Sequence, residues 1–152
     1  MQCRIDATQP EDLDAVFDLI VLQFEEHEIE APREPLRRAI TAVLSDPSLG
    51  FFLLARRDDS AIGVAYVSLI WSLEHCGRSA WLEELYVIPS ERGRGIGDEL
   101  LQAALSGMRE CGCAAADLEV EHSQQRAENL YRRAGFHEHT RRRWVRRLDG
   151  AR

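Results

Sequence analysis

A glycine-rich run beside two arginines is the part of this chain best suited to bind a charged ligand. It reads Arg92-Gly93-Arg94-Gly95-Ile96-Gly97 and follows an apolar segment, residues 82–88, that predicts a strand. Glycines let the backbone approach a ligand closely, and consecutive N–H groups at the start of a helix bind phosphate. The chain has no lysine, which excludes a P-loop, and the spacing does not fit a dinucleotide fingerprint. We therefore predict a pyrophosphate site.

Two segments together resemble the GCN5-related N-acetyltransferase (GNAT) family. The run from Arg92 to Gly97, preceded by Leu85-Tyr86-Val87, resembles the acetyl-CoA loop Arg/Gln-x-x-Gly-x-Gly/Ala, and Ala127 to Phe136 resembles the second signature of the family. Gln124 stands where that signature begins with Asn. The resemblance implies an acetyl-CoA-dependent N-acetyltransferase without a metal. It also implies a set of cofactor-binding residues: Leu85, Tyr86, Val87, Arg92, Gly93, Arg94, Gly95, Ile96, Gly97, Asp98, Gln124 and Tyr131.

Acetyl transfer to an amine requires a base, an acid and a donor to the carbonyl oxygen. The resemblance implies the backbone N–H of Val87 as that donor and Tyr131 as the acid that protonates the sulfur, although Tyr131 could instead be a core tyrosine. Strand alternation predicts that Glu83 shares a face with Leu85 and Val87 and that Glu84 faces the other way. Glu83 resembles the base of diamine acetyltransferases. It could instead anchor the acceptor, and His122 is an alternative base.

Several carboxylates are candidates for contact with the acceptor. Glu25, Glu26 and Glu28 lie where the first two predicted helices meet, and Glu74 and His75 follow a predicted strand. Together with Glu83 they would attract a cation, so we expect a primary amine of polyamine or aminoglycoside type. A protein N-terminus or lysine is the alternative acceptor, and a regulatory acyl-CoA-binding domain without turnover is an alternative of another class.

Hydrophobic periodicity and turn residues predict an α+β fold in one domain over residues 1–152. Helices are expected at about residues 9–26, 36–44, 96–112 and 123–134, and strands at 3–7, 51–55, 62–70, 81–88 and 116–121. Residues 136–148 are expected to form a final hairpin. The resemblance adds a mixed, mostly antiparallel twisted sheet whose strands at 82–88 and 116–121 splay apart.

Composition restricts the partners of the protein. The net charge of -7 argues against non-specific nucleic-acid binding, and no apolar run approaches the length of a membrane span. Cys3, Cys76, Cys111 and Cys113 lack metal-site spacing and predict free thiols. We expect a cytoplasmic protein that binds neither nucleic acid nor membrane. A homodimer is a further expectation, taken from the family.

Overall fold

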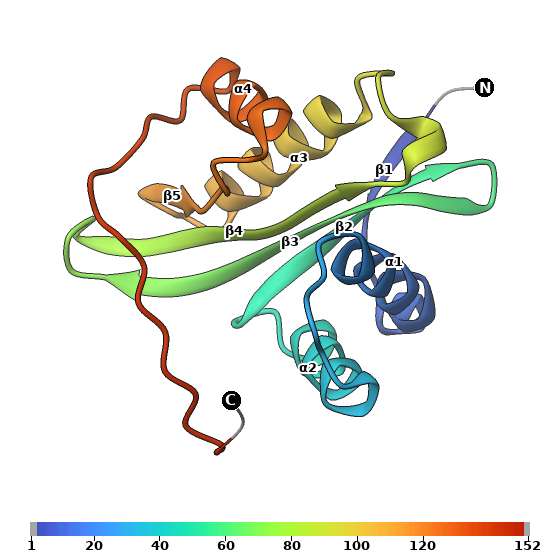
Figure 1. Cartoon of the computed structure of the whole chain (residues 1–152), viewed down its shortest axis with the longest axis horizontal. Helices are drawn as coiled ribbons and strands as arrows, with labels where there is room; N and C mark the ends of the chain where they lie inside the picture. The colour runs from blue at the N-terminus through green and yellow to red at the C-terminus, as the bar shows by residue number, and fades with distance from the viewer. Residues whose placement is uncertain (1–2, 151–152) are drawn as a thin grey trace.

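A five-stranded sheet separates two pairs of helices in the computed structural model of the protein, which describes residues 3–150 (Figure 1). The elements are β1 Arg4–Ala7, η1 Pro10–Asp12, α1 Leu13–Glu26, α2 Arg33–Ser45, β2 Gly50–Arg57, β3 Ser60–Ser72, β4 Gly77–Val87, η2 Pro89–Glu91, α3 Ile96–Glu110, β5 Ala115–Leu118 and α4 Gln125–Arg133. Strands follow the order β1-β2-β3-β4-β5, and only β4 and β5 run parallel. This confirms the predicted α+β fold with a mostly antiparallel mixed sheet.

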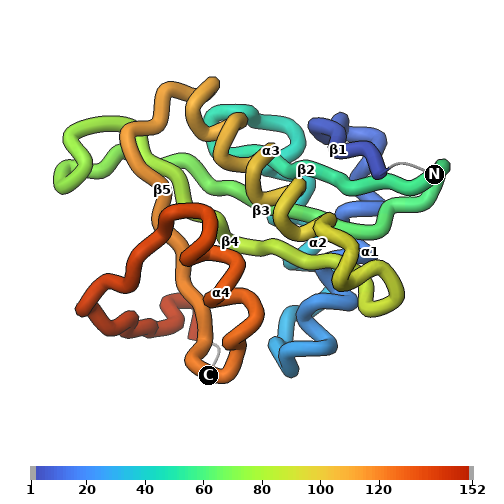
Figure 2. The backbone as a smooth tube through the Cα atoms, turned by 90° about the horizontal axis from the view of Figure 1, so that it is seen from above, coloured from blue at the N-terminus to red at the C-terminus, as the bar shows by residue number. Residues whose placement is uncertain are grey.

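Alternating side chains of the central strands build a core on each face of the sheet. On β3, Ala65 and Val67 pack into the cluster around α3, whereas Val64 and Tyr66 pack against α1 and α2. The period of two along a strand explains this division. Figure 2, seen from above, shows α3 lying over the sheet and α4 beside β5. The two faces of the sheet therefore carry different helix pairs. An opening between two strands would connect one face with the other.

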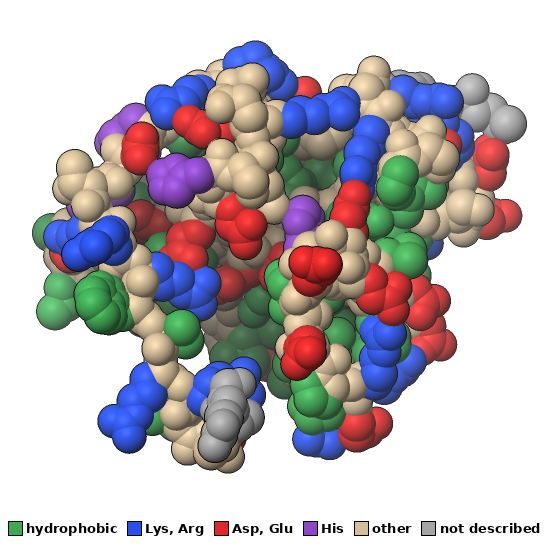
Figure 3. Space-filling view, in the orientation of Figure 1, with side chains coloured by type: hydrophobic (Ala, Val, Ile, Leu, Met, Phe, Trp, Pro, Cys, Tyr) green, Lys and Arg blue, Asp and Glu red, His purple; other side chains and the backbone are tan. Residues whose placement is uncertain are grey.

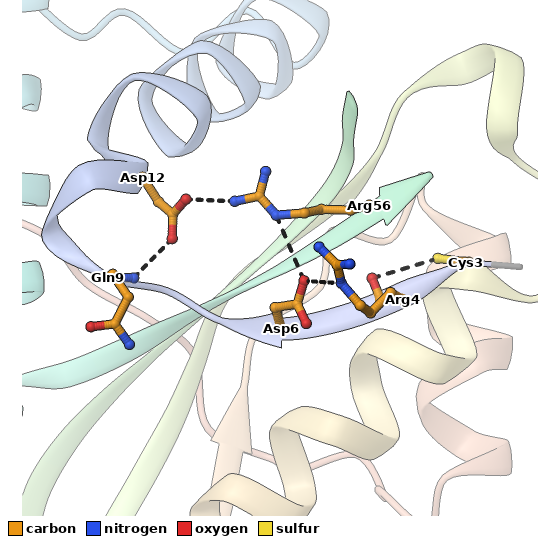
Figure 4. Close-up of polar contacts among 6 residues, drawn as sticks. All are labelled: Cys3, Arg4, Asp6, Gln9, Asp12 and Arg56. Atoms are coloured by element: carbon orange, nitrogen blue, oxygen red, sulfur yellow. Dashed lines mark hydrogen bonds and ion pairs between the residues drawn. The ribbon is translucent and has the colours of Figure 1, made fainter. Parts of the chain in front are cut away.

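Polar contacts tie the start of the chain to the sheet (Figure 4). Arg56 at the end of β2 reaches Asp12 at 2.5 Å and Asp6 at 3.7 Å. Asp12 also accepts the backbone N–H of Gln9 at 2.8 Å, which caps η1 just before α1. These contacts fix where α1 begins, and therefore where its C-terminal end lies relative to the cleft described below.

The C-terminal segment does not form the predicted hairpin. Residues 137–150 contain no helix or strand, and they run as an extended trace from α4 past the β3–β4 end of the sheet (Figure 1). Three consecutive arginines followed by Trp144 and Val145 give no alternation of polar and apolar residues, so neither face of a strand could be buried. Ion pairs hold the segment instead: Arg141 with Glu74 at 2.5 Å and Arg143 with Glu119 at 2.7 Å.

Candidate active site

Strands β4 and β5 pair over only four residues and then separate. The pairing runs from Ser79 with Ala115 to Leu82 with Leu118, which confirms the predicted splay, although β5 ends three residues before its predicted end. Because the Ile88 N–H donates to Ile62 of β3 at 3.0 Å, the N–H of the preceding Val87 points to the opposite, open edge. The backbone of Val87 therefore offers a donor where β4 has lost its neighbour.

A cleft of about 1910 Å³ occupies this opening. Sites for a drug-sized ligand have roughly 300–1,000 Å³, so the cleft has room for a large cofactor and a second substrate. Figure 3 shows acidic side chains gathered around the hollow on the near face. Its lining comes from both faces of the sheet. It includes Gln23 and Glu26 of α1, the C-cap residue His27, the β4 residues 81–87, the loop before α3, and most of α4.

The glycine loop before α3 has the backbone of an anion site. Gly93 and Gly95 have φ angles of 77° and 82°, a left-handed conformation that side chains with a Cβ rarely adopt. Within residues 3–150, the backbone N–H groups of residues 93–98 have no hydrogen-bond partner. Six consecutive free donors beside the positive end of α3 fit a phosphate group. The predicted cofactor loop therefore has the required geometry.

Arg92, the first of the two loop arginines, is neutralised by an ion pair. Arg92 donates to both carboxylate oxygens of Glu26 at 2.8 and 2.6 Å and to the Val87 carbonyl at 2.8 Å. Arg94 lies 3.7 Å from Glu91. Arg92 therefore joins the loop to the end of α1, and the pKa of Glu26 is lowered because it accepts these bonds.

Arg126, on the first turn of α4, is the free guanidinium beside the loop. A Cβ added to Gly93 would lie 3.6 Å from its Nη2 atom. Across residues 3–150, no carboxylate pairs with Arg126, whereas Arg132 pairs with Glu128 and Arg133 with Asp98. Arg126 therefore places an unneutralised cation beside Gly93 of the loop.

A β-bulge at Glu83 changes the expected positions of the two strand carboxylates. Tyr66 of β3 pairs with Glu84 and Val67 pairs with Leu82, so Glu83 is an extra residue on β4. Glu83 accepts a hydrogen bond from Ser68 at 2.8 Å, and Ser68 shares the α1 face with Tyr66. The prediction that Glu83 shares a face with Leu85 and Val87 is therefore wrong, because the bulge breaks the alternation. Both carboxylates lie on the α1 side.

Glu84 is the carboxyl with the most perturbed titration in the cleft. Burial raises its pKa to about 7, the charge of Glu83 adds to the increase, and a hydrogen bond from Gln23 opposes it. Its value thus lies near neutral pH, where a carboxylate can both take up and release a proton. Sequence alternation placed Glu84 correctly on the opposite face from Leu85, but it gave no reason to assign it a role.

Tyr131 of α4 comes close enough to Glu84 for their charges to interact. Burial raises the pKa of Tyr131 to about 12, and the charge of Glu84 contributes to the increase. Its ring packs edge-on against Phe136 with centroids 6.0 Å apart. Tyr131 is thus both a core side chain and a hydroxyl group held protonated at the cleft, so the two predicted interpretations are compatible.

Most of the predicted acceptor carboxylates already have partners. Glu25 pairs with Arg33 at 2.7 Å, Glu26 with Arg92 and Glu74 with Arg141, while His75 contacts Asp117 at 2.9 Å. Glu28 is exposed on the loop after α1. The structure therefore brings together Glu83, Glu84 and Tyr131 in the lining of the cleft. Of the three helix-junction glutamates, Glu26 lines the cleft, whereas Glu25 and Glu28 do not.

Two polar contacts distinguish the remaining candidates. Gln124, at the N-cap position of α4, contacts His27 Nδ1 through its Nε2 at 3.1 Å, so it bridges α4 to the end of α1. His122 is exposed on the loop after β5. Sequence reasoning missed Gln23, which is buried in the cleft wall. Its signal was a polar residue on the apolar stripe of α1 formed by Val16, Leu19 and Ile20.

The described part of the chain adds three simpler findings. All four cysteines are free, as predicted. Among residues 3–150, no helix is both long and apolar enough to cross a membrane. In the same residues, no three His, Cys, Asp or Glu side chains gather as a metal site would require.

Comparisons with known proteins agree on one family. The sequence model of the Acetyltransferase (GNAT) family matches residues 13–136. The chain is 28% identical over 134 residues to an aminoalkylphosphonate N-acetyltransferase of Salmonella typhimurium, covering 88% of this chain and 84% of that protein. It is 31% identical over 140 residues to a mycothiol acetyltransferase of Propionibacterium freudenreichii, of which it spans only 42%. The solved aminoglycoside N-acetyltransferase AAC(6')-Iy in complex with CoA matches with a TM-score of 0.82 and 21% identity, covering 97% of this chain and 95% of that chain.

Proposed function

This chain belongs to the GNAT acetyltransferase family, and we propose that it transfers an acetyl group from acetyl-CoA to a primary amine bound in the acidic part of the cleft. As an enzyme of this family it is an N-acetyltransferase that uses acetyl-CoA. The observation that carries the proposal is the juxtaposition, at one opening in the sheet, of a phosphate-binding loop and the carboxyl of Glu84. We take the predicted domain of residues 1–152 as the catalytic unit.

The donor is held by the loop and by the open edge of β4. Acetyl-CoA supplies an activated acetyl group as a thioester. The free N–H groups of residues 93–98 and the guanidinium of Arg126 bind phosphate, and the Val87 N–H stabilises negative charge on the acetyl oxygen. Arg92 contributes by fixing the loop to α1 rather than by contacting phosphate.

Replacing Arg126 by Gln should weaken acetyl-CoA binding about tenfold, because a charge-assisted hydrogen bond to phosphate is lost. Isothermal titration would measure the Kd. Arg132→Gln, on the same helix but paired with Glu128, should leave the Kd unchanged. Because Arg126 lies beside Gly93 in the pyrophosphate loop, we expect it to contact the pyrophosphate and not the 3'-phosphate. Arg126→Gln should therefore weaken the binding of 3'-dephospho-CoA by the same factor as that of CoA. An unchanged Kd in Arg126→Gln would remove this residue from the donor site.

Glu84 is the base in this proposal, with Glu83 as the neighbouring carboxylate that raises its pKa. An aliphatic ammonium with a pKa near 10 is neutral in only about one part per thousand at pH 7, which adds roughly 4 kcal/mol to the barrier. A carboxylate with a pKa of about 7 accepts the proton far better than one with a pKa of about 4.5. Tyr131 then donates a proton to the sulfur, and its high pKa keeps that proton in place until it is needed.

The acceptor in this proposal is a small cationic amine of polyamine or aminoglycoside type. Glu83 and Glu84 on the α1 side give the opening negative charge, which attracts an ammonium group. The fold shared with the aminoglycoside acetyltransferase AAC(6')-Iy supports an aminoglycoside. The similarity to the aminoalkylphosphonate acetyltransferase of Salmonella supports an amine that also carries an anionic group. We further propose a cytoplasmic homodimer that binds no nucleic acid. The exposure of Trp71, Leu73, Trp144 and Leu148 supports an additional contact surface.

The test combines binding with turnover. Saturating acetyl-CoA should raise the Tm, and free thiol should appear with kanamycin, spermidine or 2-aminoethylphosphonate but not without an amine. A lysine-containing peptide tests the alternative acceptor. No thermal shift would contradict the donor site, and a shift without thiol release from any amine would identify a binding protein rather than an enzyme.

A further inference from the structure

Gln23 is a buried polar residue whose hydrogen bonding is incomplete. It lies on the core-facing side of α1 and is 7% exposed. Its amide donates to Glu84, but across residues 3–150 its Oε1 atom has no hydrogen-bond partner. A buried acceptor without a partner costs about 1–3 kcal/mol. An apolar residue would complete the stripe of α1 at no such cost, so the position calls for an explanation.

The surroundings of Gln23 favour a ligand as the missing donor. Gln23 lines the same cleft as Glu84, Tyr131 and Val87, which are the groups of the proposed reaction. The side chain of Gln23 interacts with the Glu84 carboxyl, and Oε1 is its buried atom without a partner within residues 3–150. A group with N–H donors that binds beside Glu84 would satisfy it.

We propose that Gln23 is a specificity-determining residue whose Oε1 accepts one N–H of the acceptor nitrogen and so selects primary amines. The inference rests on the proposed function. Once its ammonium has lost one proton through Glu84 to solvent, a primary amine has a lone pair and two N–H groups. The lone pair forms the C–N bond as the C–S bond breaks. One N–H passes its proton to Glu84, and the other N–H remains on the nitrogen and donates to Gln23 Oε1. The departing sulfur takes the hydroxyl proton of Tyr131. The proton on Glu84 then passes through solvent to Tyr131 and restores its hydroxyl group.

A secondary amine cannot make the same set of contacts. Its single remaining N–H must face Glu84, so its N-methyl group faces Gln23 Oε1 and leaves that atom unpaired. A site built to accept an N–H rejects an analogue that lacks it, because the buried polar atom stays unsatisfied. Discrimination against N-methyl acceptors therefore measures the contact directly.

Gln23→Met tests the proposal, because Met has a similar volume and helix propensity but offers neither the amide oxygen nor the N–H. Gln102→Met, at an exposed position of α3, is the matched control. The assay compares the primary amine of the panel that wild type acetylates fastest with its N-methyl derivative. In Gln23→Met, kcat/KM for the primary amine should fall roughly 10- to 100-fold, whereas the value for the derivative changes little. Tm should hold or rise, and the Kd for acetyl-CoA should not change.

The outcomes separate this inference from the proposed function. An unchanged ratio of primary to N-methyl turnover in Gln23→Met would overturn the inference while leaving the acetyltransferase intact. Equal losses for both amines would also overturn it, since that pattern reflects only the lost hydrogen bond to Glu84. If wild type acetylates no amine, the proposed function itself fails.

Discussion

Replacing Glu84 by Gln should abolish most turnover and at the same time stabilise the fold. Removing a general base costs about 10²- to 10⁴-fold in rate. In wild type, kcat/KM should rise with pH through the pKa of Glu84, about 7, because the carboxyl must be ionised to accept a proton. That acid limb should disappear in Glu84→Gln, while the Kd for acetyl-CoA stays the same. Initial rates between pH 5.5 and 9 would measure both effects.

The stabilisation follows from the same pKa. The folded protein holds the Glu84 proton up to about pH 7, whereas the unfolded chain releases it near the ordinary value of 4.5. Wild type therefore loses stability as pH rises between these values and keeps the deficit above pH 7. A shift of this size corresponds to about 3 kcal/mol at pH 8, which Glu84→Gln should recover. Urea unfolding at pH 5 and pH 8 would show the gain mainly at pH 8.

Glu83→Gln provides the comparison for Glu84→Gln. Glu83 raises the pKa of its neighbour through its charge, so neutralising it should move the acid limb of kcat/KM to lower pH. If Glu83→Gln instead abolishes turnover and Glu84→Gln keeps it, the sequence-based assignment of Glu83 as base is right and the proposal for Glu84 is wrong. Equal stability of both variants and wild type at pH 8 would contradict the burial argument.

The donor side of the site could be predicted from sequence because it depends on backbone conformation. Gly93 and Gly95 permit the left-handed conformation of a loop whose six N–H groups have no partner within residues 3–150, and this requirement is visible in the residue types themselves. The alternating sheet and its helices follow from apolar periodicity over long segments. Local rules therefore sufficed for the loop and for most helices and strands, but not for the hairpin predicted at residues 136–148.

The acceptor side could not be predicted because it depends on contacts between distant segments. A single bulge puts Glu83 on the face of Glu84, and no residue type signals it. Arg92 has the composition of a phosphate ligand, yet Glu26, distant in sequence, neutralises it. The raised pKa of Glu84 likewise depends on its burial beneath α1, which outweighs the opposing contact with Gln23. Pairing and desolvation are tertiary properties, so charged residues counted along the chain overestimate the free charge in the cleft.

Tyr131→Phe should lower kcat by about 10²-fold or more without moving the acid limb of the pH profile. The variant removes only the hydroxyl proton that the proposal assigns to the departing sulfur. Because the pKa of Tyr131 is about 12, its hydroxyl stays protonated throughout the assay range, so the loss should be the same from pH 6 to pH 9.

Binding and thiol basicity supply the controls for Tyr131→Phe. The ring and its edge-on contact with Phe136 remain, so the Kd for acetyl-CoA should change little. Tyr66→Phe is the matched variant, since Tyr66 also lies near Glu83 and Glu84 but packs on the α1 side against Phe52, with ring centroids 4.6 Å apart. A less basic thiolate leaves more readily without being protonated. With an acetyl thioester of such a thiol, the loss of kcat in Tyr131→Phe relative to wild type should therefore be smaller. A deficit that is independent of thiol basicity, or an unchanged kcat, would remove Tyr131 as the acid and leave it a core side chain.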